Sequence, residues 1–264
     1  ALALQSVPLL LSLLTLMGVH SAFLSPVKLA MVPEIVSEEE LSHANGLLQT
    51  GSFLGIMLGT AAAGVLVRFS APDYARAAPA FALTAAVGFV TSLFIREVQA
   101  RGAPRPRWNL VAEALATLAA MKRRYGIYLA TVGSAYFWFL GAVLQMNALV
   151  YGRELMGLEP EALAAFQIAA ALGIALGSYA AGRLSRGRVE LGLVPLGAIG
   201  LVVFSLDLAF AFRSPGRALV DLFLLGASGG CFSVPLAAFI QQRSHEKERG
   251  RFIALGSLMS FIGV

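Results

Sequence analysis

The sequence has few charged residues and almost no cysteine. Of its 264 residues, 13% are charged and a single one, Cys231, is a cysteine. Soluble domains usually carry about a quarter charged residues, so this composition excludes an ordinary soluble domain. One cysteine cannot form an internal disulfide, and it excludes a thiol-rich metal site. We therefore expect no metal ion and no cofactor.

The common short motifs of enzymes are also missing. The sequence contains no G-x-S-x-G, no H-E-x-x-H and no G-x-x-x-x-G-K-[ST]. None of its three histidines is followed five positions later by aspartate, so the H-x4-D pair of glycerolipid acyltransferases is absent as well. We expect no enzyme activity from this sequence.

Long apolar runs fill most of the chain instead. Hydrophobic residues make up 58% of it, and the mean hydropathy is +0.76. A helix needs about 20 apolar residues to cross a bilayer. Eight apolar segments predict an all-α, polytopic membrane protein: 7–32, 42–68, 77–96, 126–151, 161–182, 190–212, 217–241 and 250–264. Because both ends lie in apolar sequence, we expect a segment truncated from a longer membrane protein.

Basic residues set the expected orientation. If the loop after Lys28 is cytoplasmic, alternation places fifteen of the 20 lysines and arginines on the inner side. Because membrane topology accounts for the excess of basic residues, the net charge of +5 does not indicate binding to nucleic acid. The long basic connector 97–125 separates two parts, 1–96 and 126–264. It is either a surface-bound amphipathic helix or a plain linker with a helical piece.

Two polar residues stand out in the first segment. Lys28 lies near its inner end, where the ammonium either reaches the headgroups or faces the interior and attracts an anionic group. His20 is either a packed, hydrogen-bonded histidine or a proton carrier. Beyond them, Ser37-x-x-Glu40 predicts a capping box that opens the next helix.

The second segment combines a small-residue strip with polar groups. The strip is typical of tight helix packing, because it lets two backbones approach each other, and it contains Gly51, Gly55, Gly59 and Ala63. Asn45 and Gln49 lie close to one helix face and either bond a neighbouring helix or line a wet cavity.

The fourth segment is the most polar span. Tyr136, Trp138, Gln145 and Asn147 would be costly facing lipid, so we expect them to contact a substrate; for Tyr136 and Trp138 the alternative is an anchoring role at the membrane interface. Gln145 and Asn147 are two residues apart and cannot both face one cavity squarely. Asp207 in the sixth segment is an intramembrane acid and a candidate for ion or proton coupling.

Several stretches resemble a known transporter family. SPVKLAMVPEIVSEEELSHANGLLQTGSFLGIMLGTAAAGVL is similar to the fourth and fifth helices of lysophospholipid transporters within the major facilitator superfamily. YFWFLGAVLQ, YAAGRLS, VELGLVPLG and VPLAAFIQQRS extend the likeness over nearly the whole chain. Members fused to a glycerophospholipid acyltransferase are the most similar.

The resemblance implies helices four to eleven of two six-helix bundles. It implies movement of lysophospholipid, chiefly lysophosphatidylethanolamine, across the bacterial inner membrane for re-acylation, with a fused or associated acyltransferase. Lys28 matches the lysine of the family's S-P-x-K element. Gln145 stands where some members carry arginine, which puts headgroup recognition by this helix in doubt. Alternatives are a transporter of another solute, such as a drug or organic anion, and a membrane anchor for an acyltransferase.

Overall fold

The computed structural model describes residues 6–71, 73–95 and 109–263, and within these ranges it contains helices and no strand. The helices are α1 (Val7–Ile35), α2 (Leu41–Ser70), α3 (Ala78–Ser92), α4 (Leu110–Lys122), α5 (Tyr125–Val150), α6 (Pro160–Leu184), α7 (Leu193–Phe210), α8 (Pro215–Arg243) and α9 (Glu246–Gly263). Short turns are η1 (Glu38–Glu40), η2 (Tyr74–Ala77), the π-helical η3 (Tyr151–Leu155) and η4 (Ala211–Arg213). The predicted all-α fold is confirmed.

Seven of the eight expected segments form helices that are long and apolar enough to cross a membrane, counting the described residues alone. The eighth segment forms α9, which is not among them. Its first two turns carry five charged side chains, which lower the hydropathy of an 18-residue helix: Glu246, Lys247, Glu248, Arg249 and Arg251.

Local signals explain where several helices begin. Glu40 accepts a hydrogen bond from the backbone N–H of Ser37 at 3.3 Å, so the predicted capping box is confirmed, although its first turn is the 3-10 turn η1. Ser214 caps α8, and Pro215 occupies its first position, where a missing N–H costs nothing.

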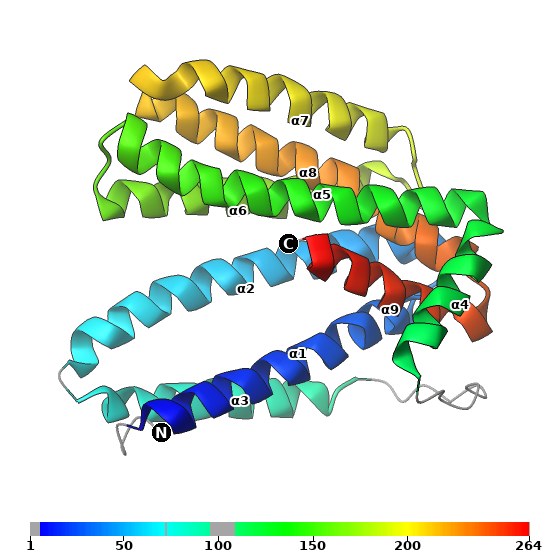
Figure 1. Cartoon of the computed structure of the whole chain (residues 1–264), viewed down its shortest axis with the longest axis horizontal. Coiled ribbons are helices and arrows are strands. Elements are labelled where there is room, and N and C mark those ends of the chain that lie inside the picture. The colour runs from blue at the N-terminus through cyan, green and yellow to red at the C-terminus, as the bar shows by residue number, and fades with distance from the viewer. Residues whose placement is uncertain (1–5, 72, 96–108, 264) are drawn as a thin grey trace.

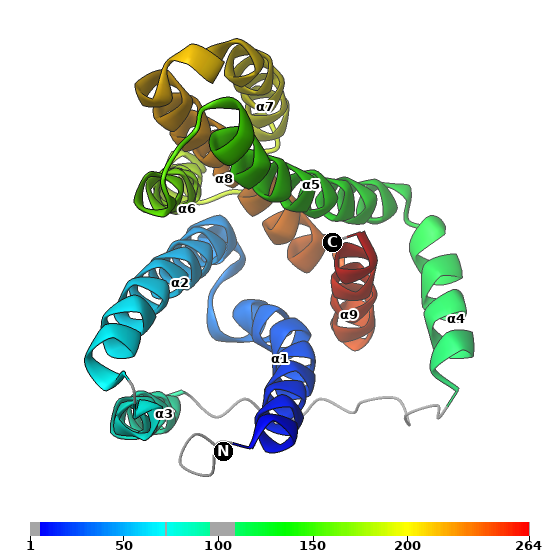
Figure 2. The ribbon, with the colours of Figure 1, turned by 60° about the vertical axis from the view of Figure 1, so that its left-hand side comes forward.

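The helices alternate in direction and gather their predicted inner ends at one side. In Figure 1 this side is on the right, where α1 ends, α2 begins and α8 passes into α9. Helix α8 is the central element, packed between α6 and α7. Helix α2 lies against α6, and α9 lies against α1, α4 and α5, as Figure 2 shows.

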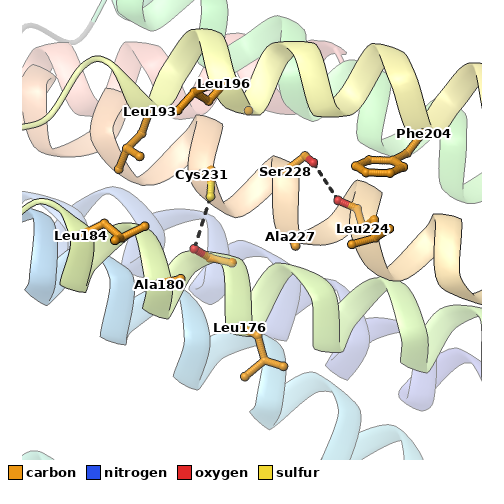
Figure 3. Close-up of a pocket in the computed structure, with 12 residues that line it drawn as sticks. Leu176, Ala180, Leu184, Leu193, Leu196, Phe204, Leu224, Ala227, Ser228 and Cys231 are labelled. Carbon is orange, nitrogen blue, oxygen red and sulfur yellow. Dashed lines mark hydrogen bonds between the residues drawn. The ribbon is translucent and has the colours of Figure 1, made fainter.

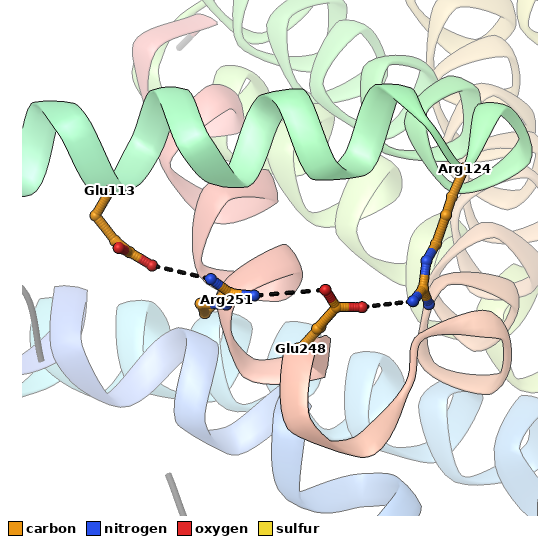
Figure 4. Close-up of polar contacts among 4 residues, drawn as sticks. All are labelled: Glu113, Arg124, Glu248 and Arg251. Carbon is orange, nitrogen blue, oxygen red and sulfur yellow. Dashed lines mark hydrogen bonds and ion pairs between the residues drawn. The ribbon is translucent and has the colours of Figure 1, made fainter. Parts of the chain in front are cut away.

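The connector contains the expected helix, α4, whereas its start, 97–108, lies outside the described residues. Leu110, Val111 and Leu115 on α4 are more than 60% exposed. A chain of ion pairs fastens α4 to α9 and to the start of α5 (Figure 4). Its members are Glu113, Arg251, Glu248 and Arg124, joined by contacts of 3.3, 3.5 and 2.5 Å in that order. Whether α4 lies on the membrane surface stays a prediction.

The tightest contact of α2 lies nearer its start than the predicted strip. A Cβ added to Gly46 would lie 2.6 Å from the Ser178 carbonyl oxygen of α6, and one on Gly182 would lie 3.1 Å from the His43 Cα. The strip of Gly51, Gly55, Gly59 and Ala63 is exposed, and no atom of another described helix lies within 4 Å of a Cβ built on its three glycines. Helix α2 therefore crosses α6 through Gly46 and Gly182, and packing against the strip stays a prediction.

Candidate functional site

A row of polar side chains on one face of α2 meets α8 at the inner end. Asn45 and Gln241 are buried, 3% and 1% exposed. Asn45 Nδ2 donates to Gln241 Oε1 at 2.6 Å, and Gln241 Nε2 donates back to Asn45 Oδ1 at 3.1 Å and to the Leu29 carbonyl of α1 at 3.0 Å. Gln241 of α8 thereby joins α1 and α2, whose bonded residues Leu29 and Asn45 lie 212 and 196 positions earlier in the sequence.

The row continues along α2 in both directions. Toward the outer side, Gln49 and Ser233 of α8 exchange hydrogen bonds of 2.9 and 3.2 Å. Toward the inner side, Ser42 donates to the Arg188 carbonyl at 3.2 Å. Arg186 and Gly187, both with positive φ, form the turn that precedes this carbonyl. We call the contacts of Ser42, Asn45 and Gln49 with their partners the inner seam.

An ion pair extends the inner seam to α1 and α9. Arg249 Nη1 lies 2.8 Å from Glu34 Oε1, and the two side chains are 12% and 24% exposed. Arg249 Nε also donates to the Gln241 carbonyl at 3.1 Å. Because this pair is half-buried, it is less screened by salt than a surface pair.

The first helix carries its two predicted polar residues on exposed positions. Lys28 directly precedes Leu29, whose carbonyl belongs to the inner seam, and its own side chain is exposed. Neither Lys28 nor His20 has a hydrogen bond or ion pair within the part of the chain that the structure describes. The geometry therefore brings Lys28 to the edge of the seam and leaves His20 apart from it.

Aromatic rings lie one turn beyond Gln49. Phe53 of α2 stacks on Trp138 of α5 with ring centroids 6.5 Å apart and planes 2° apart. Trp138 also meets Phe137 edge-on at 5.5 Å, and it remains 38% exposed. Tyr136 is 60% exposed and contacts Phe139 of its own helix. Trp138 is thus the predicted aromatic residue that lies between α2 and α5.

The two amides near the outer end of α5 lie away from the inner seam. Gln145 donates to Gln167 of α6 at 3.4 Å, and Asn147 donates to the Val143 carbonyl of its own helix at 2.8 Å. Both side chains are exposed. The structure therefore divides the predicted site residues between an inner seam and a separate outer group.

Asp207 forms a third group at the outer ends of α7 and α8. Both of its carboxylate oxygens accept from Arg217, one of them from Nε at 3.0 Å. Asp221, one turn further along α8, is 3% exposed, and its Oδ2 has no hydrogen-bond partner among the described residues.

A groove of about 430 Å³ lies over α8 between α6 and α7 (Figure 3). Its lining is apolar apart from Ser228 and Cys231, whose side chains point to the carbonyls of Leu224 and Gly177. None of the predicted site residues lines this groove.

Sequence reasoning missed the partners of the inner seam on α8 and α9. Gln241 ends the apolar segment 217–241 and Arg249 belongs to the charged stretch after it, where polar residues are ordinary, and Ser233 is a single serine within the segment. The usable signal was Gln241 within VPLAAFIQQRS, a glutamine placed at the inner end of a predicted span. Asp221 was also missed, although the signal that singled out Asp207, an acid within an apolar segment, applies to it as well.

Comparisons with known proteins show what the whole sequence is similar to. The family model of the Major Facilitator Superfamily matches residues 1–264. A "Lysophospholipid transporter LplT" of Citrobacter koseri is 31% identical over 250 residues, and those of Escherichia coli O7:K1 and Shigella flexneri serotype 5b are 32% identical over 250 and 254 residues. Each match covers 92% of this chain and 61% of the relative, so the chain spans about three-fifths of the length of these curated relatives. No solved structure gives a significant match.

Proposed function

Because the chain belongs to the Major Facilitator Superfamily, we propose that it is part of a transporter that moves lysophospholipid across the membrane. Its seven candidate spans and its family make it a multi-pass protein of the bacterial inner membrane. The proposal takes the substrate class from relatives named as lysophospholipid transporters. We further propose that 1–96 and 126–264 belong to two helix bundles joined by the connector 97–125.

The inner seam is the observation that carries the proposal. Its contacts join α1 and α2 to α8 and α9 at the inner end, whereas the outer two thirds of α1 is exposed within the described part. Alternating access requires contacts that close one end while the other is open. We interpret this arrangement as a state closed on the inner side, and the seam as the closure that must break for release.

The polar and aromatic residues suit the chemistry of a lysophospholipid, which offers a phosphate and one acyl chain. Lys28 supplies a cation without a partner among the described residues, placed beside the seam, and a charge-assisted bond to phosphate is its natural use. Trp138 and Tyr136 provide apolar surface with a polar edge. The amides of Asn45 and Gln49 become free for the headgroup once the seam opens.

Gln145 and Asn147 contribute polar groups nearer the outer end. Their exposed amides can bond headgroup oxygens at entry, although they bring no charge. Lys28 is therefore the main headgroup contact in our proposal.

Re-acylation of the imported lipid requires a second activity, because this sequence lacks the acyltransferase histidine–aspartate pair. We propose that a fused or associated acyltransferase consumes the lipid on the inner side. Co-purification of acyltransferase activity with the intact protein is the expected result, and a transporter that purifies without it would contradict this association.

Uptake of labelled lysophosphatidylethanolamine into spheroplasts tests the proposed function. Lys28→Ala in the intact protein should reduce uptake at least tenfold at normal expression, and Lys28→Arg should retain most of it. Lys247→Ala, which removes an exposed lysine on the inner side, is the matched control and should have no effect. Unchanged uptake in Lys28→Ala would remove this lysine from the mechanism. Competition by an organic anion but not by lysophospholipid would favour a transporter of another solute. Absence of any uptake would favour a membrane anchor for an acyltransferase.

A further inference from the structure

Two carboxyl groups and one guanidinium meet at the outer ends of α7 and α8. Asp207 lies on α7, and Arg217 and Asp221 lie one turn apart on α8. Asp207 accepts hydrogen bonds from Arg217, and Asp221 follows Arg217 one turn later on the same helix, which makes the two carboxyl groups neighbours. This trio is separate from the inner seam and from the residues proposed to contact lipid.

Arg217 does not satisfy every acceptor of the trio. Its Nε and one of its Nη atoms donate to Asp207, and the structure shows no donor for the buried Oδ2 of Asp221. The other titratable group next to Asp221 is Tyr151 of η3, and its hydroxyl donates to the Leu208 carbonyl at 2.6 Å. Neither the guanidinium nor the phenol therefore satisfies this oxygen.

The net charge of the trio also indicates that one carboxyl group carries a proton. With both carboxyl groups ionised, the trio would carry one net negative charge, half-buried among helices that span the membrane, which is costly. Two neighbouring carboxyl groups, one of them buried, do not readily ionise together, and one of them keeps a proton. A proton on Asp221 neutralises the trio and turns its unsatisfied oxygen into a donor toward Asp207.

We propose that Asp207 and Asp221 form a proton-binding site at the outer end of α7 and α8, in which Asp221 holds the proton and donates it in a hydrogen bond to Asp207. The Asp207 side chain is 37% exposed, whereas Asp221 lies behind it at 3%. Asp207 is thus the route by which a proton from the outer side reaches Asp221. The site does not depend on the identity of the transported molecule.

Infrared difference spectroscopy of the intact protein in lipid tests this site without a transport assay. The wild-type spectrum at neutral pH should contain the carbonyl stretch of a protonated, hydrogen-bonded carboxylic acid, shifted in D₂O. Asp221→Asn should lose this band, because the amide keeps the hydrogen bond to Asp207 but cannot hold the acid proton. Asp73→Asn, which changes an exposed acid of an outer loop, should retain it.

Asp207→Asn provides the second variant and should also lose the band. Arg217 then becomes free to pair with Asp221, which no longer needs a proton to balance its charge. Persistence of the band in Asp221→Asn would refute the assignment of the proton to Asp221. Persistence of the band in Asp207→Asn would refute the hydrogen bond through which Asp221 shares this proton with Asp207. Loss of the band when sodium is added at constant pH would show a sodium site in place of a proton site.

Discussion

Gln241→Leu removes the side chain that joins α1, α2 and α8 in the inner seam. The substitution nearly preserves volume and loses three hydrogen bonds, two with Asn45 and one with the Leu29 carbonyl. At about 1 kcal/mol for each bond, the inner-closed state loses about 2–3 kcal/mol relative to the inner-open state. The ratio of closed to open molecules should then fall roughly 30- to 150-fold.

Spin labels on Glu39→Cys and Lys247→Cys, with Cys231→Ala as background, report this change through their distance. Both labelled side chains are exposed, and neither belongs to the inner seam. The wild type should show one short distance, and Gln241→Leu should move most molecules to a longer one. Gln242→Leu is the matched control, because its only side-chain bond among the described residues is an exposed 3.5 Å contact with Glu38. An unchanged distance distribution in Gln241→Leu would refute the reasoning.

Three further predictions concern the fold and the seam. Exchanging the charges of Glu34 and Arg249 should restore the short spin-label distance that either single reversal lengthens; a double variant as open as the singles would contradict a direct pair. Gly46→Val should destabilise the protein by about 1–3 kcal/mol and lower its melting temperature, because the new side chain overpacks the α2–α6 crossing; an unchanged melting temperature would contradict this crossing. A fluorophore on Leu115→Cys should be quenched by lipid-borne quenchers if α4 lies on the bilayer; quenching by aqueous agents alone would favour the plain linker.

Much of the fold could be predicted from the sequence because spans depend on local hydropathy. The apolar runs, the capping box of Ser37 and Glu40 and the alternation of helix direction are local or nearly local properties. The long-range contacts were harder to predict. Gly46 and the three glycines of the strip look alike in the sequence, and only the crossing of α2 with α6 singles out Gly46.

The candidate site likewise combines residues that could be predicted from the sequence with residues that could not. Asn45 and Gln49 could be predicted because two amides on one face of a membrane helix require partners. Gln241 and Ser233, 196 and 184 residues further along the chain, could not be paired with them by any local rule. Asp221 is, like Asp207, a single acid in an apolar segment, so the same rule could have singled it out. Its proximity to Asp207 could not be predicted, because it depends on α7 and α8 lying side by side.

Movement of lysophospholipid by the purified, intact protein tests the central claim most directly. The measurement is the transfer of labelled lysophosphatidylethanolamine between the leaflets of proteoliposomes, compared with protein-free vesicles of the same lipid composition. Our account predicts transfer well above the protein-free rate and its reduction by Lys28→Ala. Transfer at the protein-free rate, from a protein that is folded and correctly inserted, would contradict it.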